Sequence, residues 1–278
     1  RAPRKPLVEK TRFNGRVSST RVTDALVMEL DEVKAIRKAL DGAVTINDIV
    51  VSIVGGAMRR YLQDKGELPA DSLSCGAPIS VRSERSSSSK GNQVSIMMIG
   101  MATDIEDPVE RLRAVHDNAE VSKAVSGTLG NHVMMDLTEM FIPQVMGWGL
   151  QAATSAAARA HIPLPFHTIV SNVPGPQFPL YLAGARVSLM MGMGPLLHMM
   201  GLFHAVISGA GKISINFVSC REMLPDPEAY RQCLQQAYED LRAGATALGG
   251  GKAARGRAAR GKAARGKASA RTRKKHGG

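Results

Sequence analysis

Apolar and polar residues along the chain follow two distinct periodicities. Alternation with a period of two, or a short continuous apolar run, predicts β-strands at residues 22–30, 73–81, 92–102, 166–173, 181–191, 200–208 and 212–219. The segment 92–102 is apolar enough that we expect it to be buried on both faces. Turns between the last strands are predicted at four glycines, Gly192, Gly194, Gly209 and Gly211.

Helical periodicity separates these strands. Asp31 is a suitable N-cap for a short helix over 32–40, and a longer helix is predicted to begin at 45–48 and to end before Gly66 and Pro69. Further helices are expected at 107–125, at 131–159 with a break near Pro143, and at 225–245. Strands interrupted by helices, with hairpins late in the chain, predict a mixed α/β fold in which helices flank the sheet.

The net charge of +12 is concentrated at the C-terminus. From Gly249 onward there are five Lys, six Arg and no acidic residue, in a repeat with a period of five that begins at Lys252. Setting those eleven aside leaves 25 basic residues against 24 acidic ones, so the rest of the chain is nearly neutral. We therefore expect a connector at 1–20, one folded unit at 21–248 and a disordered tail at 249–278.

Several common chemistries have no motif in the sequence. There is no phosphate-binding loop, dinucleotide fingerprint, nucleophile elbow or zinc-protease helix, and no apolar run is long enough to span a bilayer. His132 and Asp136 have the HxxxD spacing of acyltransferases, but Leu137 follows in place of Gly, and we interpret the two as a pair on a helix surface. The cysteines have no metal-binding spacing and are interpreted as reduced thiols of a cytoplasmic protein: Cys75, Cys220 and Cys233.

A series of short motifs gives the clearest functional indication. In chain order they are T-R-F-N-G at 11–15 with Arg21, N-D-I-V-V-S at 47–52, P-I-S-V-R at 78–82 with G-N at 91–92, D-P-V-E-R-L at 107–112, S-N-V-P-G-P at 171–176 and L-P-D at 224–226. Each is short, but the set in this order resembles the bacterial wax ester synthase/diacylglycerol acyltransferase family. The resemblance extends from about residue 11 to 243 and excludes the tail.

The resemblance implies a fold related to chloramphenicol acetyltransferase, in which two α/β halves enclose a tunnel. The family's HHxxxDG motif lies in the N-terminal half, where its second His is the general base for an acceptor hydroxyl that attacks an acyl-CoA thioester. This sequence contains no HHxxxDG, so it resembles the C-terminal lobe only. It is expected to contain no catalytic residue, no metal and no cofactor, and to make no ester alone.

The same resemblance implies the partners. They are an N-terminal lobe, acyl-CoA, and diacylglycerol or a long-chain alcohol, which would give triacylglycerol or a wax ester. The expected location is the cytoplasm, peripheral on a membrane or on lipid bodies. The alternative is a non-catalytic scaffold or binding protein with a tail that binds nucleic acid.

Candidate substrate-binding residues come from the matched motifs, and each has a structural alternative. Asn47 and Asp48 order a helix that faces the cleft, or only cap it. Asn172 and the following Pro-Gly-Pro turn shape the tunnel mouth or bridge the halves, or form a rigid turn. Arg82 attracts the CoA phosphates, or forms a surface ion pair. The full set is Asn47, Asp48, Arg82, Asn92, Ser171, Asn172, Pro174 and Gly175.

Methionines and the tail each leave alternatives open. The many methionines of the predicted strands suit either a channel for acyl chains or ordinary core packing. The basic tail suits an anionic membrane surface or nucleic acid, or serves only as a solubilising extension.

Overall fold

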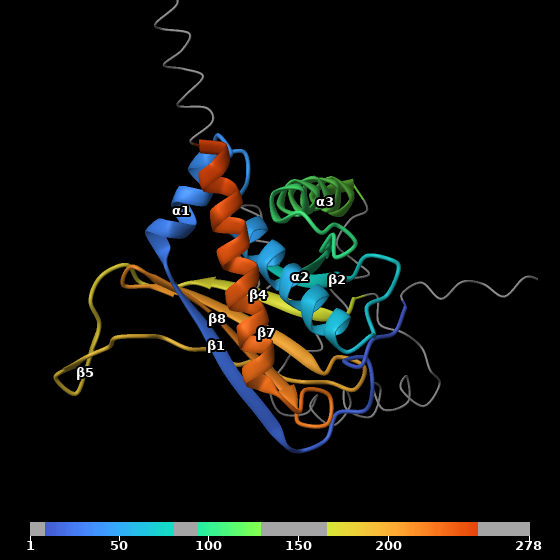
Figure 1. Cartoon of the computed structure of the whole chain (residues 1–278). Helices are drawn as coiled ribbons and strands as arrows, with labels where there is room; N and C mark the ends of the chain where they lie inside the picture. The colour runs from blue at the N-terminus through green and yellow to red at the C-terminus, as the bar shows by residue number, and fades with distance from the viewer. Residues whose placement is uncertain (1–8, 81–93, 129–165, 250–278) are drawn as a thin grey trace, which may run out of the picture.

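A six-stranded mixed sheet forms the centre of the molecule (Figure 1). The computed structural model describes residues 9–80, 94–128 and 166–249. The strand order is β1-β8-β7-β4-β2-β3, in which β4 is parallel to β7 and β2 and the other pairs are antiparallel. The strands are β1 (Arg21–Glu29), β2 (Ser74–Ser80), β3 (Val94–Gly100), β4 (Thr168–Pro174), β7 (Leu202–Gly209) and β8 (Lys212–Cys220). The predicted mixed α/β class is confirmed.

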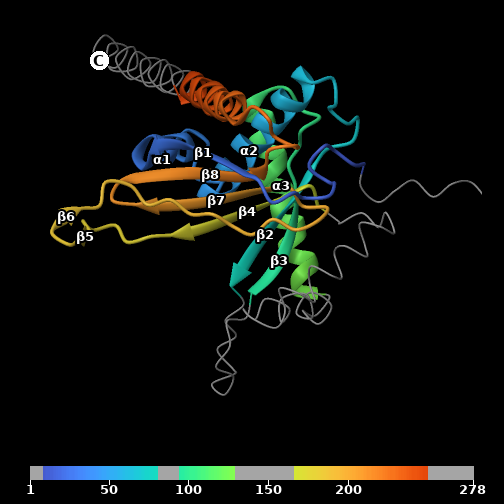
Figure 2. The ribbon, with the colours of Figure 1, turned by 90° about the horizontal axis from the view of Figure 1, so that it is seen from below.

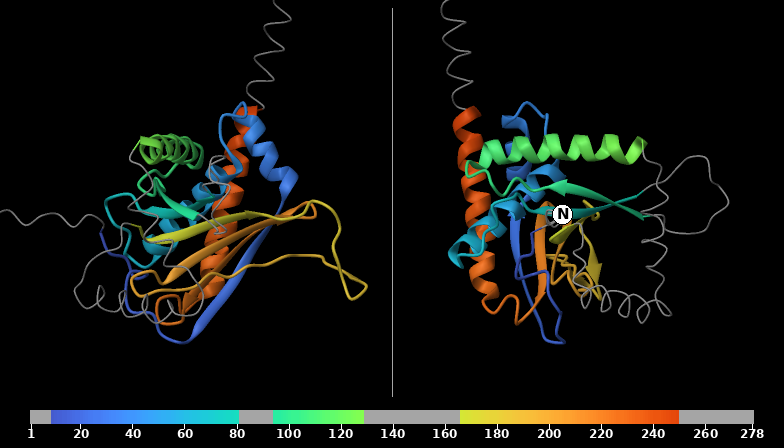
Figure 3. Two further views of the ribbon diagram at one scale, coloured as in Figure 1. Left: turned by 180° about the vertical axis from the view of Figure 1, so that it is seen from behind. Right: turned by 90° about the vertical axis from the view of Figure 1, so that its right-hand side faces the viewer.

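The helices pack over the sheet. Helices α1 (Leu30–Ala39), α2 (Ile46–Asp64) and the C-terminal helix (residues 227–249) lie on one face, whereas α3 (Pro108–Thr128) runs beside β3 and contacts α2 (Figures 2 and 3). The main apolar core lies between the sheet and these helices. No helix of the described residues combines the length and apolar character that a bilayer crossing requires.

The central strands bury both of their faces. On the helix face, Phe217 of β8 packs edge-on against Tyr230 of the C-terminal helix, with ring centroids 4.9 Å apart. On the opposite face, a second cluster contains Phe203, Ile169 and Val218. Both sides of β7 and β8 therefore exclude water, which is why these strands read as nearly continuous apolar runs in the sequence.

A fully buried histidine is part of this core. His204 of β7 hydrogen-bonds through Nδ1 to Thr168 Oγ1 at 3.0 Å and through Nε2 to the Tyr230 hydroxyl at 2.8 Å. Thr168 donates its own proton to the Leu202 carbonyl, so Nδ1 is the protonated nitrogen and Nε2 accepts from Tyr230. Burial lowers the pKa of His204 to about 3, and the ring is therefore neutral.

Tyr230→Phe tests this arrangement. The change leaves Nε2 of His204 buried without a donor, and we expect the free energy of unfolding to fall by about 1–3 kcal/mol in urea denaturation. Tyr238→Phe is the matched control on the same helix, because its hydroxyl bonds to Glu32, a carboxylate that water reaches. We expect the control to lose less than about 1 kcal/mol. Equal losses in the two variants would contradict the role given to His204.

The predicted strand at 181–191 is wrong. Only Tyr181–Leu182 (β5) and Ala185–Arg186 (β6) are extended, as a small hairpin whose turn residues Ala183 and Gly184 both have positive φ. The chain from 187 to 196 has no regular secondary structure. Gly192 and Gly194 are not turn residues but lie against β7, where a Cβ on Gly194 would fall 2.3 Å from the Phe203 ring.

Two further expectations are corrected. β3 is not buried on both faces: it is an edge strand, and Met98 is 39% exposed between the buried Met97 and Ile99. Asp31 does not cap α1, because the helix begins at Leu30, two residues before the predicted start, and Asp31 lies within its first turn. The predicted helix at 131–159 and the pair His132 and Asp136 lie outside the described residues.

Candidate functional site

The sheet divides at the strand that carries the S-N-V-P-G-P motif. β4 pairs with β2 at two positions only, Thr168 with Cys75 and Ile169 with Gly76, but with β7 at six. Beyond Ile169 the β2–β3 hairpin turns away while β4 continues beside β7 (Figure 2). The motif residues Ser171–Pro174 therefore lie where the sheet opens, and this opening is the candidate site.

Ser171 and Asn172 lie on opposite faces of the sheet at this opening. Ser171 pairs with Ala205 and shares the face of Phe203, whereas Asn172 pairs with Val206 on the helix face. Both are half-buried, and the next two residues, Val173 and Pro174, are exposed. Successive side chains of a strand point to opposite faces, so a small ligand bound on one face can contact the side chain of Ser171 or that of Asn172, but not both.

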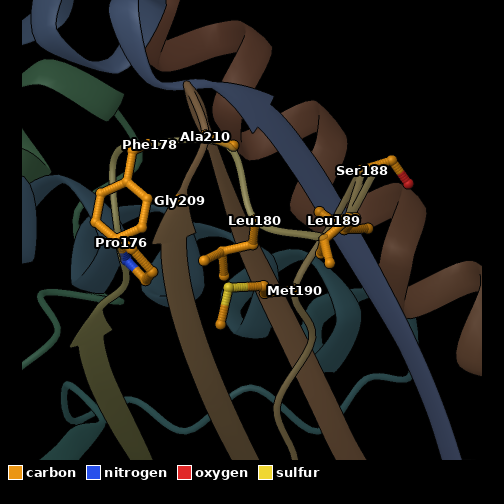
Figure 4. A pocket seen from close by; sticks show the side chains of 9 residues that line it. Pro176, Phe178, Leu180, Ser188, Leu189, Met190, Gly209 and Ala210 are labelled. Atoms are coloured by element: carbon orange, nitrogen blue, oxygen red, sulfur yellow. The ribbon is translucent and has the colours of Figure 1, made fainter. Parts of the chain in front are cut away.

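The Pro-Gly-Pro turn is fixed to the β7–β8 hairpin. The Gly175 N–H donates to the Ser208 carbonyl at 2.6 Å, and the Ala210 N–H donates to the Pro176 carbonyl at 3.2 Å. Beyond the turn, apolar side chains enclose a small pocket, shown in Figure 4 and formed by Pro176, Phe178, Leu180, Leu189 and Met190 with the backbone of Gly209 and Ala210. These two hydrogen bonds hold the turn that follows β4 against the β7–β8 hairpin.

Gly175→Ala is expected to destabilise this turn. A Cβ at this position would lie 2.5 Å from the Ser208 carbonyl oxygen, a backbone atom that cannot rotate away. We expect a loss of about 1–3 kcal/mol in thermal or urea unfolding, as for other overpacked sites. Gly249→Ala is the control, since a Cβ there meets nothing within 4 Å. A Gly175→Ala variant as stable as this control would show that the close approach does not constrain the turn.

The N-D motif begins α2 with a capping box. Thr45 is the N-cap: its Oγ1 accepts the Asp48 N–H at 3.1 Å, and Asp48 Oδ2 accepts the Thr45 N–H at 2.8 Å. The same carboxylate oxygen accepts from Nδ1 of His116 on α3 at 2.9 Å. Asp48 is almost completely buried, so its carboxylate is occupied by contacts within the protein. Asn47 is half-buried, and its side chain forms no hydrogen bond with the described residues.

The candidate residues of the N-D motif do not bond to those of the S-N-V-P-G-P motif. No hydrogen bond or ion pair within the described ranges links Asn47 or Asp48 to the residues 171–175. Arg82 and Asn92 lie outside the described residues. The pair of Asp48 and His116 was missed from the sequence, because its members are 68 positions apart and His116 belongs to none of the motifs.

The remaining motifs form structural contacts. In T-R-F-N-G, Asn14 bonds to Thr11 and to the Met199 carbonyl, and Phe13 is fully buried. Asp226 of L-P-D accepts from the Tyr61 hydroxyl and from Lys65. These contacts explain the motifs by packing and hydrogen bonding without a ligand.

The D-P-V-E-R-L motif also has a structural role. Asp107 caps α3 by accepting the N–H groups of Val109 and Glu110, each at 2.8 Å. Arg111 is buried and donates to the carbonyls of Ile105 and Glu106. Burial, and then the nearby guanidinium groups of Arg59 and Arg60, lower the pKa of Arg111 to about 10, which still leaves it charged.

Four histidines lie in the described part of the chain, and each has at least one ring nitrogen hydrogen-bonded within the fold. His204 is bonded through both nitrogens, and His167 bonds to the Ser74 N–H and the Glu9 carbonyl. His198 accepts from the Val17 N–H. His116 alone pairs with a carboxylate and borders an open hollow, between α3, the α1–α2 loop and the C-terminal helix. None of the four lies among the residues of the S-N-V-P-G-P opening.

Metal and thiol chemistry receive no support from the described residues. No group of three or more potential metal ligands occurs within 9–80, 94–128 and 166–249. The three cysteines are free thiols, and burial raises the pKa of Cys75 to about 12 and that of Cys233 to about 11. Both thiols are therefore protonated and poorly nucleophilic near neutral pH.

Comparison with known proteins identifies similar sequences. The family model of the WS/DGAT C-terminal domain matches residues 90–242. A Mycobacterium tuberculosis protein named as a diacylglycerol O-acyltransferase is 32% identical over 240 residues, which are 85% of this chain and 47% of that protein. The chain therefore spans about half the length of the curated relatives it matches.

Solved structures support the fold. The wax ester synthase/diacylglycerol acyltransferase of Marinobacter aquaeolei VT8 superposes with a TM-score of 0.67 at 22% identity, over 86% of this chain and 52% of that one. The nonribosomal peptide synthetase FmoA3 gives a TM-score of 0.52 at 12% identity, over 83% of this chain and 23% of the other. These likenesses confirm the predicted relation in fold, and the family match places the chain in the C-terminal half.

Proposed function

Since the chain belongs to the wax ester synthase/diacylglycerol acyltransferase family, we propose that it is one half of an enzyme that transfers an acyl group from acyl-CoA to an alcohol. Its acceptor is a diacylglycerol or a long-chain alcohol, and its product a triacylglycerol or a wax ester. The observation that carries the proposal is the match of the family's C-terminal domain to residues 90–242, in a chain that covers about half of its relatives. Acyl-CoA is a substrate, and no cofactor is invoked.

The proposed reaction needs a base that accepts the proton of the acceptor hydroxyl. The described histidines do not suit that role at the opening of the sheet, because three are bonded into the fold and His116 lies against Asp48. We infer that the base belongs to the other half, in the HHxxxDG motif that the family resemblance implies. The chain described here contributes the opposite wall, with the opening beside Asn172 as its proposed contact with substrate.

An exposed apolar arm supports this division into halves. The segment that contains β5 and β6 leaves the body and extends away from the sheet (Figures 1 and 2). Large apolar side chains of this arm lie in solvent: Leu182 is 76% exposed, and Phe178 and Tyr181 are exposed as well. Met191 and Met193 are also exposed, where the chain returns across β7. Apolar surface of this kind is typical of an interface, and the N-terminal half is its proposed partner.

The activity of the purified 278-residue chain tests the division. We expect no labelled triacylglycerol or wax ester above background when the chain is incubated with labelled acyl-CoA and either diacylglycerol or a long-chain alcohol. The wax ester synthase/diacylglycerol acyltransferase of Marinobacter aquaeolei VT8, assayed in parallel, is the positive control for the conditions. Ester formed by the isolated chain would contradict the proposal that the base lies elsewhere.

A further inference from the structure

The strand β1 has one edge that no described strand covers. It is the terminal strand of the central sheet, and its nine residues pair with β8 without a bulge, from Arg21 opposite Cys220 to Glu29 opposite Lys212. Figure 1 shows β1, in blue, at this border of the sheet. The sequence R-V-T-D-A-L-V-M-E contains no Pro, so every residue keeps its N–H group. A long edge of this kind is a template on which another strand can pair.

The backbone groups of alternate residues point outward from this edge. The Leu30 N–H donates to the Gly211 carbonyl at 2.9 Å, and the Arg221 N–H donates to the Thr20 carbonyl at 3.3 Å, both between the β1 and β8 segments. In an antiparallel pair, the N–H and C=O of one residue point to the same side, and those of the next residue to the other. The even-numbered residues therefore face β8, and the odd-numbered residues of β1 face outward.

The outward groups match those of a second copy of the same strand. When two copies of β1 lie antiparallel about a two-fold axis at Ala25, residue 21 faces residue 29 of the copy, and residue 23 faces residue 27. Every outward residue then faces another outward residue, as an antiparallel ladder requires. This is the symmetric register in which all nine residues of both strands are paired.

Opposite charges meet at both ends of this register. Arg21 of each copy faces Glu29 of the other, and opposite charges across two strands stabilise their pairing. In the single chain, Glu29 pairs with Lys212 at 2.6 Å and Arg21 donates to the Ser18 carbonyl. Both side chains are exposed at the surface, so they can change partner without breaking a buried contact.

The residues between the ends also fit. Val27 is 40% exposed and would be covered by Thr23 of the copy, a β-branched pair. Ala25 is small enough to face itself at the axis. One contact has to open, because Asp24 Oδ1 accepts the outward N–H of Ala25 at 2.7 Å. Asp24 keeps a second partner in Arg231 at 3.5 Å, so its carboxylate stays paired when Ala25 bonds across the axis.

We propose that the chain forms a symmetric homodimer in which the two β1 strands pair antiparallel about Ala25 and join two six-stranded sheets into one. The symmetry uses the free β1 edge of both copies, so the assembly closes at two. Because a single pair of strands buries less surface than a standard interface, we expect a dimer that dissociates on dilution. The proposal concerns assembly and holds whether or not the chain is half of an acyltransferase.

A cysteine at the axis tests the register. Two Cα atoms that face each other in a hydrogen-bonded antiparallel pair lie about 5.5 Å apart, which a disulfide can bridge. Ala25→Cys in the 278-residue chain should therefore give a covalent dimer on mild oxidation, measured by non-reducing electrophoresis. The unaltered chain, with its three free thiols, sets the background.

Thr23→Cys is the matched control for the axis position. Residue 23 lies on the same strand and the same face as Ala25 and is more exposed, so chance collisions would couple it more readily. In the proposed register, however, the two copies of residue 23 are offset by about 14 Å along the strands, too far for a disulfide. We expect little covalent dimer from this variant.

Charge exchange tests the ion pairs. Arg21→Glu places two carboxylates at each end of the pairing and should raise the dimer dissociation constant at least about tenfold in sedimentation equilibrium. Arg21→Glu with Glu29→Arg restores the opposite charges and should return the constant to within about threefold of its original value. Lys123→Glu, on α3 beside the opposite edge of the sheet, is the control for net charge and should change little. Circular dichroism verifies that each variant is folded.

Three results would overturn the proposal. The first is a chain that stays monomeric at about 100 µM, which would leave the β1 edge to another partner such as the N-terminal half. The second is equal coupling of Ala25→Cys and Thr23→Cys. The third is a dimer that Arg21→Glu does not weaken, which would show that another surface joins the copies. None of these measurements depends on ester formation, so the proposed enzymatic function can fail or hold independently.

Discussion

Asp48→Ala should lower the free energy of unfolding by about 3 kcal/mol. The change removes the capping box of α2, worth about 1 kcal/mol, and a partly buried charge-assisted hydrogen bond to His116, worth about 1.5–3 kcal/mol. It also leaves the Thr45 N–H without its acceptor. Urea denaturation followed by circular dichroism measures the effect.

The neighbouring residue of the same motif provides the matched control. Asn47 lies in the same helical turn but is only half-buried, and its side chain forms no hydrogen bond with the described residues. Asn47→Ala should therefore change the free energy of unfolding by no more than about 0.5 kcal/mol. A double-mutant cycle of Asp48→Ala with His116→Ala should give a coupling energy of about 1–3 kcal/mol. An Asp48→Ala variant with unchanged stability would show that the carboxylate is free for a ligand, and the structural interpretation of the motif would be wrong.

Stability should also fall as the pH is lowered from 6.5 to 5. His204 is neutral in the folded protein, where burial lowers its pKa to about 3, but in the unfolded chain its pKa returns to about 6.5. The unfolded state therefore binds a proton that the folded state cannot, so stability is complete above pH 6.5 and decreases below it. At pH 5 the loss due to His204 alone is about 2 kcal/mol.

His167 contributes in the same direction, since burial also lowers its pKa. The pH range from 6.5 to 5 lies above that in which carboxylates such as Glu67 and Asp226 titrate, because the pKa values of these carboxylates are lowered. The measurement is the free energy of unfolding at several pH values between 7 and 5. In His204→Gln the slope of this free energy against pH should be smaller by the equivalent of about one proton bound on unfolding. Parallel curves for the variant and the unchanged protein would contradict the low pKa assigned to His204.

The regular elements of the fold could be predicted because their signals are local. The N-terminus of α2 follows from Thr45 and Asp48, a capping box that is written in the sequence. The β7–β8 hairpin follows from two apolar strands around Ala210 and Gly211, both of which adopt positive φ. Periodicity and turn chemistry were sufficient in both cases.

The segment 181–196 could not be predicted in this way. Its apolar residues have the composition of a strand, but the sheet has no place for another strand beside β7, which already pairs with β4 and β8. The chain instead passes over β7, where Gly192 and Gly194 permit close approach to Ile207 and Phe203. Which contacts a glycine permits is decided by the tertiary structure.

The sequence names the candidate residues, which stay a prediction, but not the geometry around them. The resemblance identified Ser171–Gly175, and the structure places these residues where the sheet opens. That opening depends on how many residues of β2 and β4 remain paired, and no local sequence pattern determines that number. The contact between Asp48 and His116 has the same origin, since it joins two helices that are distant in the sequence.

The central claim is that this chain closes against another half before an ester can form. Its most direct test is a fusion in which the unmatched N-terminal part of the Mycobacterium tuberculosis relative precedes this chain, incubated with labelled acyl-CoA and diacylglycerol. We predict labelled triacylglycerol from the fusion, and none when Ala replaces the second His of the HHxxxDG motif that the family resemblance implies for the added half. A folded fusion that forms no ester, or one that keeps its activity without that His, would contradict the account.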